Sequence, residues 1–215
     1  MVRNISLYSV LFILVTAFTG SNPEKKGNQR AFYECTDPLD IDSSLFVPKK
    51  GKVCFYFDTK RSPAHKDFTD FIWYDNAKAT DYFTAYLVNA SDSSFTAKRQ
   101  DGSLIMIQEA LDEKGKWLPI EYWVYSGCGN SYFDPLELGS GKYVMIPIKK
   151  YTGSFQTKIR LRFLQGNKLY CSEPFDANID KSQFKKETEN VNGILYHGKA
   201  NYLEREDTAE PIVLK

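Results

Sequence analysis

Histidine is scarce in this chain, since only His65 and His197 occur among 215 residues. The four cysteines include no Cys-x-x-Cys pair, and neither histidine lies close to a cysteine in the sequence. Structural zinc sites draw four such ligands from short, regular spacings. We therefore expect neither a metal site nor a cofactor.

An excess of charge of either sign is also missing. Lys and Arg number 28 and Asp and Glu number 27, so the formal net charge is +1. A nucleic-acid-binding domain normally carries a strongly basic patch or a high isoelectric point. We therefore expect no nucleic-acid partner.

Long apolar runs are absent except at the N-terminus. Arg3 precedes a nearly apolar stretch from Leu7 to Phe18, and the small residues Thr19 and Gly20 follow. This is the layout of a secretory signal peptide, and the stretch is shorter than the roughly 20 apolar residues of a membrane span. We expect residues 1–20 to be a signal peptide, the mature chain to lack a membrane span, and the protein to be secreted or periplasmic, and so extracytoplasmic. A retained membrane anchor is the alternative.

Export changes the interpretation of the cysteines. An even number of cysteines in an oxidising compartment predicts disulfides. The four residues allow three pairings, and we expect Cys35–Cys54 and Cys128–Cys171 because each pair joins neighbouring parts of the chain.

Period-two alternation dominates the middle of the chain. Phe155–Leu164 places Phe155, Ile159 and Leu161 on one face and charged residues on the other, as in a half-buried strand. Asp101-Gly102 lies between two strand-like runs, which is typical of a tight hairpin. With an aromatic content of 15%, which favours sheets, this rhythm predicts an all-β, immunoglobulin-like antiparallel sandwich.

The rhythm also divides the chain. We expect a linker and loop at 21–44, the β-sandwich domain at 45–180 and a C-terminal extension at 181–215, with a short helix after Asp180. Trp117–Tyr125 is predicted as one long strand. Pro119 and Pro147 cannot donate to a ladder, so both are expected at edges or bulges.

Three segments resemble a group of known proteins. They are Trp117-Leu118-Pro119-Ile120-Glu121, Cys128-Gly129-Asn130-Ser131-Tyr132 and Gly153-Ser154-Phe155-Gln156-Thr157-Lys158-Ile159-Arg160. Over about residues 80–180 the chain is similar to secreted bacterial proteins with an immunoglobulin-like β-sandwich and no assigned activity. The resemblance implies the fold and carries no function.

Two surfaces are candidate binding sites. Lys158, Arg160 and Arg162 form a basic ladder on one strand face, which suits an acidic glycan or an acidic partner. The alternative is a solvated face balanced by Asp and Glu on adjacent strands.

The second candidate surface is aromatic. Trp117, Trp123 and Tyr125 lie along one predicted strand, and Tyr122, Tyr132 and Phe133 lie nearby. Exposed aromatic side chains suit sugars and protein partners, whereas core packing is the alternative for the tryptophans.

No catalytic set stands out. The thiol of Cys128 lies in a glycine-rich loop at 126–131 and could act as a nucleophile, but the exported context favours a disulfide-anchored turn in which the glycines serve the turn geometry. Four carboxylates could supply a pair for glycoside hydrolysis, namely Glu109, Asp112, Glu113 and Glu121. We therefore predict an exported, non-enzymatic binding module for a protein partner or surface glycan. The alternatives are an extracytoplasmic enzyme using Cys128 or a carboxylate pair, and a structural subunit of a cell-surface assembly.

Overall fold

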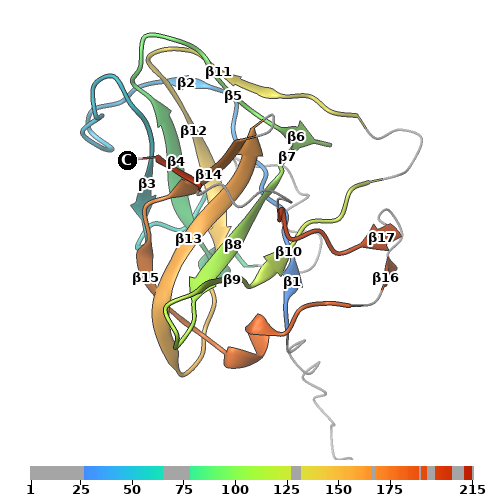
Figure 1. Ribbon diagram of the computed structural model, residues 1–215. Helices are drawn as coiled ribbons and strands as arrows, with labels where there is room; N and C mark the ends of the chain where they lie inside the picture. The colour runs from blue at the N-terminus through green and yellow to red at the C-terminus, as the bar shows by residue number, and fades with distance from the viewer. Residues whose placement is uncertain are drawn as a thin grey trace, which may run out of the picture.

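Two layers of β-sheet make up this protein, which is described as a computed structural model (Figure 1). The described residues are 27–64, 78–126, 132–165, 168–188, 190–192, 197–204 and 211–214. The predicted signal peptide at 1–20 and the loop residue Cys128 lie outside them. Among the described residues, no helix is long and apolar enough to cross a membrane.

The first layer is a four-stranded antiparallel sheet in the order β2-β12-β4-β3. Its strands are β2 (Leu39–Asp40), β12 (Lys142–Lys149), β4 (Tyr82–Asn89) and β3 (Val53–Asp58). Alternation along β4 sends Phe83 and Leu87 to the main core, and Tyr86 and Val88 to a second cluster on the outer face. Both faces of this sheet are therefore covered, which explains its dense apolar sequence.

The second layer follows the order β18-β14-β13-β8-β9, with β15 also paired to β13. Its strands are β18 (Ile212–Leu214), β14 (Lys168–Ser172), β13 (Phe155–Gln165), β8 (Met106–Leu111), β9 (Trp117–Pro119) and β15 (Phe175–Ile179). β13 is the long central strand, and Figure 1 shows it in front of β4 and β12.

Aromatic contacts join the two layers. The ring centroids of Phe55 on β3 and Phe163 on β13 lie 5.9 Å apart, and those of Phe57 and Phe175 lie 4.7 Å apart. Such offset and edge-to-face pairs add to the free energy of apolar burial. The main core thus lies between the sheets, as in a sandwich.

Short elements complete the fold. Two two-residue pairs are formed by β1 (Gln29–Arg30) with β10 (Glu121–Tyr122) and by β6 (Arg99–Gln100) with β7 (Ser103–Leu104). Two three-residue pairs are formed by β5 (Phe95–Ala97) with β11 (Leu136–Leu138) and by β16 (Asn190–Asn192) with β17 (His197–Lys199). The single-turn helices are η2 (Ala79–Asp81) and η3 (Lys181–Phe184). Asp180 caps η3 by accepting from the Ser182 amide.

Both ends of the described chain join the sandwich. β1 pairs in parallel with β10, and β18 pairs in parallel with β14. Leu214 of β18 is buried in the main core. Residues outside the expected 45–180 domain thus contribute strands to it.

The all-β prediction is confirmed, and the immunoglobulin-like topology stays a prediction. β12 pairs with β2 only at Lys142 and Tyr143, so Pro147, which has no N–H to donate, lies beyond this pairing. The single strand predicted for Trp117–Tyr125 is wrong. β9 ends at Pro119, and β10 begins at Glu121 in a different sheet.

The expected disulfides are not formed in the structure. Cys35, Cys54 and Cys171 are free thiols, and Cys128 lies outside the described residues. The Cys35 sulfur instead accepts from the Arg99 guanidinium at 3.9 Å, whereas its expected partner Cys54 is buried on β3. Burial raises the pKa of Cys35 to about 11 and the pKa of Cys171 to about 12, so both thiols are protonated at neutral pH.

Candidate functional site

A tight hairpin organises the most exposed aromatic region of the protein. β6 and β7 are joined by Asp101 and Gly102, whose φ angles are 52° and 78°. Two positive φ angles are those of the predicted Asp-Gly turn. The hairpin therefore forms from local sequence and can serve as a scaffold for the segments around it.

Hydrogen bonds attach a neighbouring segment to this hairpin. The Gln100 side chain donates to the carbonyl of Ser126 at 2.9 Å and accepts from its amide at 3.2 Å. Asp101 and Tyr132 are also joined, because the Asp101 amide donates to the Tyr132 carbonyl at 3.2 Å. The hairpin thus fixes the positions of Tyr125, which precedes Ser126, and of Phe133, which pairs with Gln100 as a single bridge.

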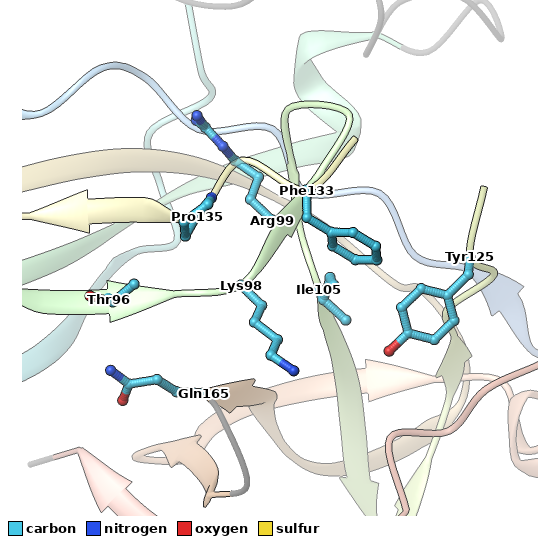
Figure 2. A pocket seen from close by; sticks show the side chains of 8 residues that line it. All are labelled: Thr96, Lys98, Arg99, Ile105, Tyr125, Phe133, Pro135 and Gln165. Carbon is cyan, nitrogen blue, oxygen red and sulfur yellow. The ribbon is translucent and has the colours of Figure 1, made fainter. Parts of the chain in front are cut away.

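An ion pair fixes the other side of the same segment. The Arg99 guanidinium donates to the Asp134 carbonyl at 3.0 Å and to its carboxylate at 2.6 Å. Both side chains are partly shielded from solvent. The contact directs the Arg99 charge toward Asp134, and Figure 2 shows the guanidinium pointing away from the cavity described next.

A cavity of about 480 Å³ opens beside the hairpin (Figure 2). Its volume lies within the usual range of ligand sites, and its surface is predominantly carbon. The lining residues come from four separate parts of the chain and are Thr96, Lys98, Arg99, Ile105, Tyr125, Phe133, Pro135 and Gln165.

Exposed aromatic rings gather at this cavity. Tyr125, Phe133 and the adjacent Tyr132 are 39%, 61% and 63% exposed. The centroids of Tyr125 and Phe133 lie 6.3 Å apart with tilted planes, so the two rings contact each other. Large apolar side chains left exposed and clustered mark interaction sites rather than ordinary surface.

Polar groups are few here. Lys98 is exposed, and its ammonium has no ion-pair partner within the described part of the chain. Figure 2 shows this ammonium on the same side as the Tyr125 hydroxyl. Burial raises the pKa of Tyr125, so its hydroxyl remains a neutral hydrogen-bond donor. The arrangement can hold an apolar group beside an anionic one.

The predicted basic ladder lies elsewhere and its charges are already paired. Arg160 and Arg162 both donate to the Glu109 carboxylate, at 2.9 and 2.6 Å, and Lys158 pairs with Asp176 at 2.8 Å. Arg160 also stacks on the Trp117 ring at 4.4 Å, and Arg162 donates to the Leu203 carbonyl. The basic charges are therefore balanced by Asp and Glu on adjacent strands, which is the alternative given for this face in the sequence analysis.

Replacing Glu109 by glutamine is expected to lower the free energy of unfolding by about 2 kcal/mol. The Glu109 side chain is 1% exposed and those of Arg160 and Arg162 are 14% and 12% exposed, so both guanidinium groups would lose their counter-charge in a shielded place. Urea unfolding measures the change. Glu137→Gln on the exposed face of β11 is the control, and equal midpoints for the two variants would contradict the assignment.

The aromatic residues predicted as one surface separate in the structure. Trp117 lies under Arg160, Trp123 is 4% exposed in the main core, and Tyr125 lines the cavity. The break at Ile120 causes this separation, because it ends the alternation on which the prediction depended. Lys98 and Gln165 were missed, since nothing in their local sequence places them beside Phe133.

The candidate catalytic carboxylates are occupied. The Glu121 carboxylate is 2% exposed and accepts from Tyr33, Tyr151 and Gln108. Asp112 accepts from amides of its own turn, and Glu113 pairs with Lys181. No group of three or more His, Cys, Asp or Glu side chains able to hold a metal ion occurs in the described ranges.

Fold and site together define an all-β protein of two packed sheets with an aromatic-walled cavity at one hairpin. No protein-family model, curated protein or solved structure matches the chain.

Proposed function

We propose that this protein is an exported, non-enzymatic binding module for a protein partner or a surface glycan, and that the cavity lined by Tyr125 and Phe133 is its ligand site. The observation that carries the proposal is the pair of exposed aromatic side chains, Tyr125 and Phe133, at a cavity of ligand size. The signal-peptide pattern at residues 1–20 supports export.

The chemistry of the cavity favours binding over catalysis. The described lining contains no thiol and no carboxylate, and its titratable groups are Lys98, Arg99 and Tyr125. Arg99 is held by Asp134. Nucleophilic or acid–base catalysis needs a nucleophile and a base within hydrogen-bond reach.

An immunoglobulin-like sandwich is part of the same proposal. Two mainly antiparallel sheets pack face to face around one core, as in that class.

Phe133→Ala is expected to weaken ligand binding at least about tenfold, because exposed aromatic residues at a cavity act as binding hot spots. The mature chain would be screened on a glycan array and by chemical crosslinking to extracellular proteins, and each ligand found would then be titrated. Val47→Ala is the matched control, since Val47 is 82% exposed and does not line the cavity. A ligand held equally well by both variants, or empty results from both screens, would count against the proposal.

A further inference from the structure

We propose that the occupant of this cavity is an acidic peptide segment of a partner protein, which inserts an apolar side chain beside the contacting rings of Tyr125 and Phe133 and pairs a neighbouring carboxylate with Lys98. The inference rests on the proposed function and specifies its ligand.

The apolar side chain of the proposed ligand is inferred from the residues that line the cavity. Tyr125, Phe133, Ile105 and Pro135 present rings and aliphatic carbon to the cavity. A sugar carries hydroxyl groups around its whole rim, and leaving polar groups unpaired in such a place costs free energy. A single large apolar side chain buries its surface against these walls without that cost, as an anchor residue does at a protein interface.

The acidic half follows from charge. Within the described part of the chain, Lys98 of the lining has no ion-pair partner, whereas Arg99 is bound to Asp134. It lies between β5 and β6, and its carbonyl accepts from the Ile105 amide at 3.0 Å, so its backbone is fixed beside the apolar floor. A lysine at the rim of an apolar site favours a partner with a carboxylate next to its anchor and disfavours a basic one.

The size of the cavity agrees with one anchor and its neighbours. About 480 Å³ accommodates a large side chain with adjacent backbone.

Peptide titrations monitored by amide NMR shifts test the proposal on the full mature chain. The probes are three blocked hexapeptides: one with a central phenylalanine flanked by two glutamates, a second with the glutamates replaced by glutamines, and a third with the phenylalanine replaced by alanine. A short uronic-acid oligosaccharide is the fourth probe. We expect the first peptide to shift the amides of Thr96, Lys98 and Phe133 and to bind about three- to fivefold more tightly than the second, which is the size of an exposed ion pair. The third should bind at least about tenfold more weakly than the first.

Charge reversal provides the matched variant. Lys98→Glu should invert the preference, so that a peptide with lysines beside the phenylalanine binds better than the acidic one. Because Lys98 is exposed, the variant is expected to fold, and its unchanged amide spectrum away from the cavity checks this.

The outcomes separate the two levels of the hypothesis. Equal binding of the glutamate and glutamine peptides, or an unchanged preference in Lys98→Glu, would overturn the acidic-peptide assignment. Cavity shifts with the oligosaccharide alone would replace the peptide by a glycan and leave the proposed function in place. Shifts that depend only on protein concentration would identify a second copy as the occupant and overturn the assignment too. If no probe shifts the amides at the cavity, the acidic-peptide assignment is wrong. If, in addition, Phe133→Ala and wild type bind the ligands from the screens equally well, the proposed function is wrong too.

Discussion

An alanine at position 153 is expected to lower the free energy of unfolding by at least about 3 kcal/mol, the cost of a severe overpacking change. A Cβ atom built on Gly153 would lie 2.1 Å from the carbonyl carbon and oxygen of Ile179 and 2.3 Å from the amide nitrogen of Asp180. Carbon atoms in favourable contact are about 3.5–4.0 Å apart, so one of the two backbones has to move.

Moving either backbone, that of Gly153 or that of Ile179 and Asp180, costs free energy because both are tied to neighbouring elements. Ile179 is fully buried and pairs with Phe155 at the start of β13, and Asp180 caps η3. A shift at Gly153 therefore disturbs the pairing of β13 with β15 and the small core beneath it. Position 153 is exposed and lies in a loop, where most residues are normally accepted. The close approach of Ile179 and Asp180 is the physical reason why glycine is needed there.

Urea and thermal unfolding of Gly153→Ala measure this effect. Gly139→Ala is the matched control, because the nearest atom to its added Cβ is Lys142 Cγ at an ordinary 3.7 Å. The control should unfold at nearly the wild-type midpoint. If both variants unfold at the same midpoint, the close approach at Ile179 is not a feature of the folded protein.

Local pattern predicts the central strands of this protein well. Alternation in Val53–Asp58, Tyr82–Asn89 and Phe155–Gln165 corresponds to the two faces of the sheets that these strands form. Asp101-Gly102 likewise predicts its hairpin, because the positive φ angles are a property of the two residues themselves. Where a few neighbouring residues determine the conformation, the sequence is sufficient.

Long-range pairing is where prediction from sequence fails. β1 and β18 have two and three residues and pair in parallel with distant strands. Strands this short are not long enough to show the period-two alternation from which a strand is predicted. The cavity brings together residues from Thr96 to Gln165. The expected cysteine pairs failed for a related reason, since separation along the chain does not determine which face of which sheet a side chain occupies.

Replacing Glu121 by alanine is expected to lower the free energy of unfolding by about 4 kcal/mol, because several buried donors would lose their acceptor and each such loss costs about 1–3 kcal/mol. One carboxylate oxygen accepts from the Tyr33 hydroxyl and, at 2.7 Å, from the Gln108 amide. The other accepts from the Tyr151 hydroxyl at 2.6 Å and the Gln108 side chain at 3.2 Å. Tyr33 and Glu121 are separated by 88 positions, so this network joins distant parts of the fold.

The network also predicts how stability depends on pH. Burial is the main cause that raises the pKa of Glu121 above its ordinary value of 4.5, against the lowering effect of its hydrogen bonds and of Lys149. The folded state therefore binds this proton more tightly than the unfolded state. The contribution of the Glu121 proton to the free energy of unfolding is fully present below pH 4.5. It is lost as the pH rises from there through the folded-state pKa of Glu121. The pKa values of Tyr33 and Tyr151 are raised well above their ordinary value, also chiefly by burial, so both hydroxyls remain donors throughout.

Urea unfolding of wild type and Glu121→Gln between pH 4 and pH 8 measures the effect of this proton on the free energy of unfolding. Glutamine has nearly the shape of the glutamate side chain but does not titrate. The difference in unfolding free energy between wild type and Glu121→Gln should favour wild type most at pH 4 and shrink as the pH rises, because only wild type pays to ionise a buried group. A difference that grows with pH would mean that the hydrogen bonds from Tyr33, Tyr151 and Gln108 stabilise the carboxylate more than burial destabilises it. In that case Glu121 would be an ionised anchor of the fold, and the loss on Glu121→Ala would be greatest at neutral pH instead of at pH 4.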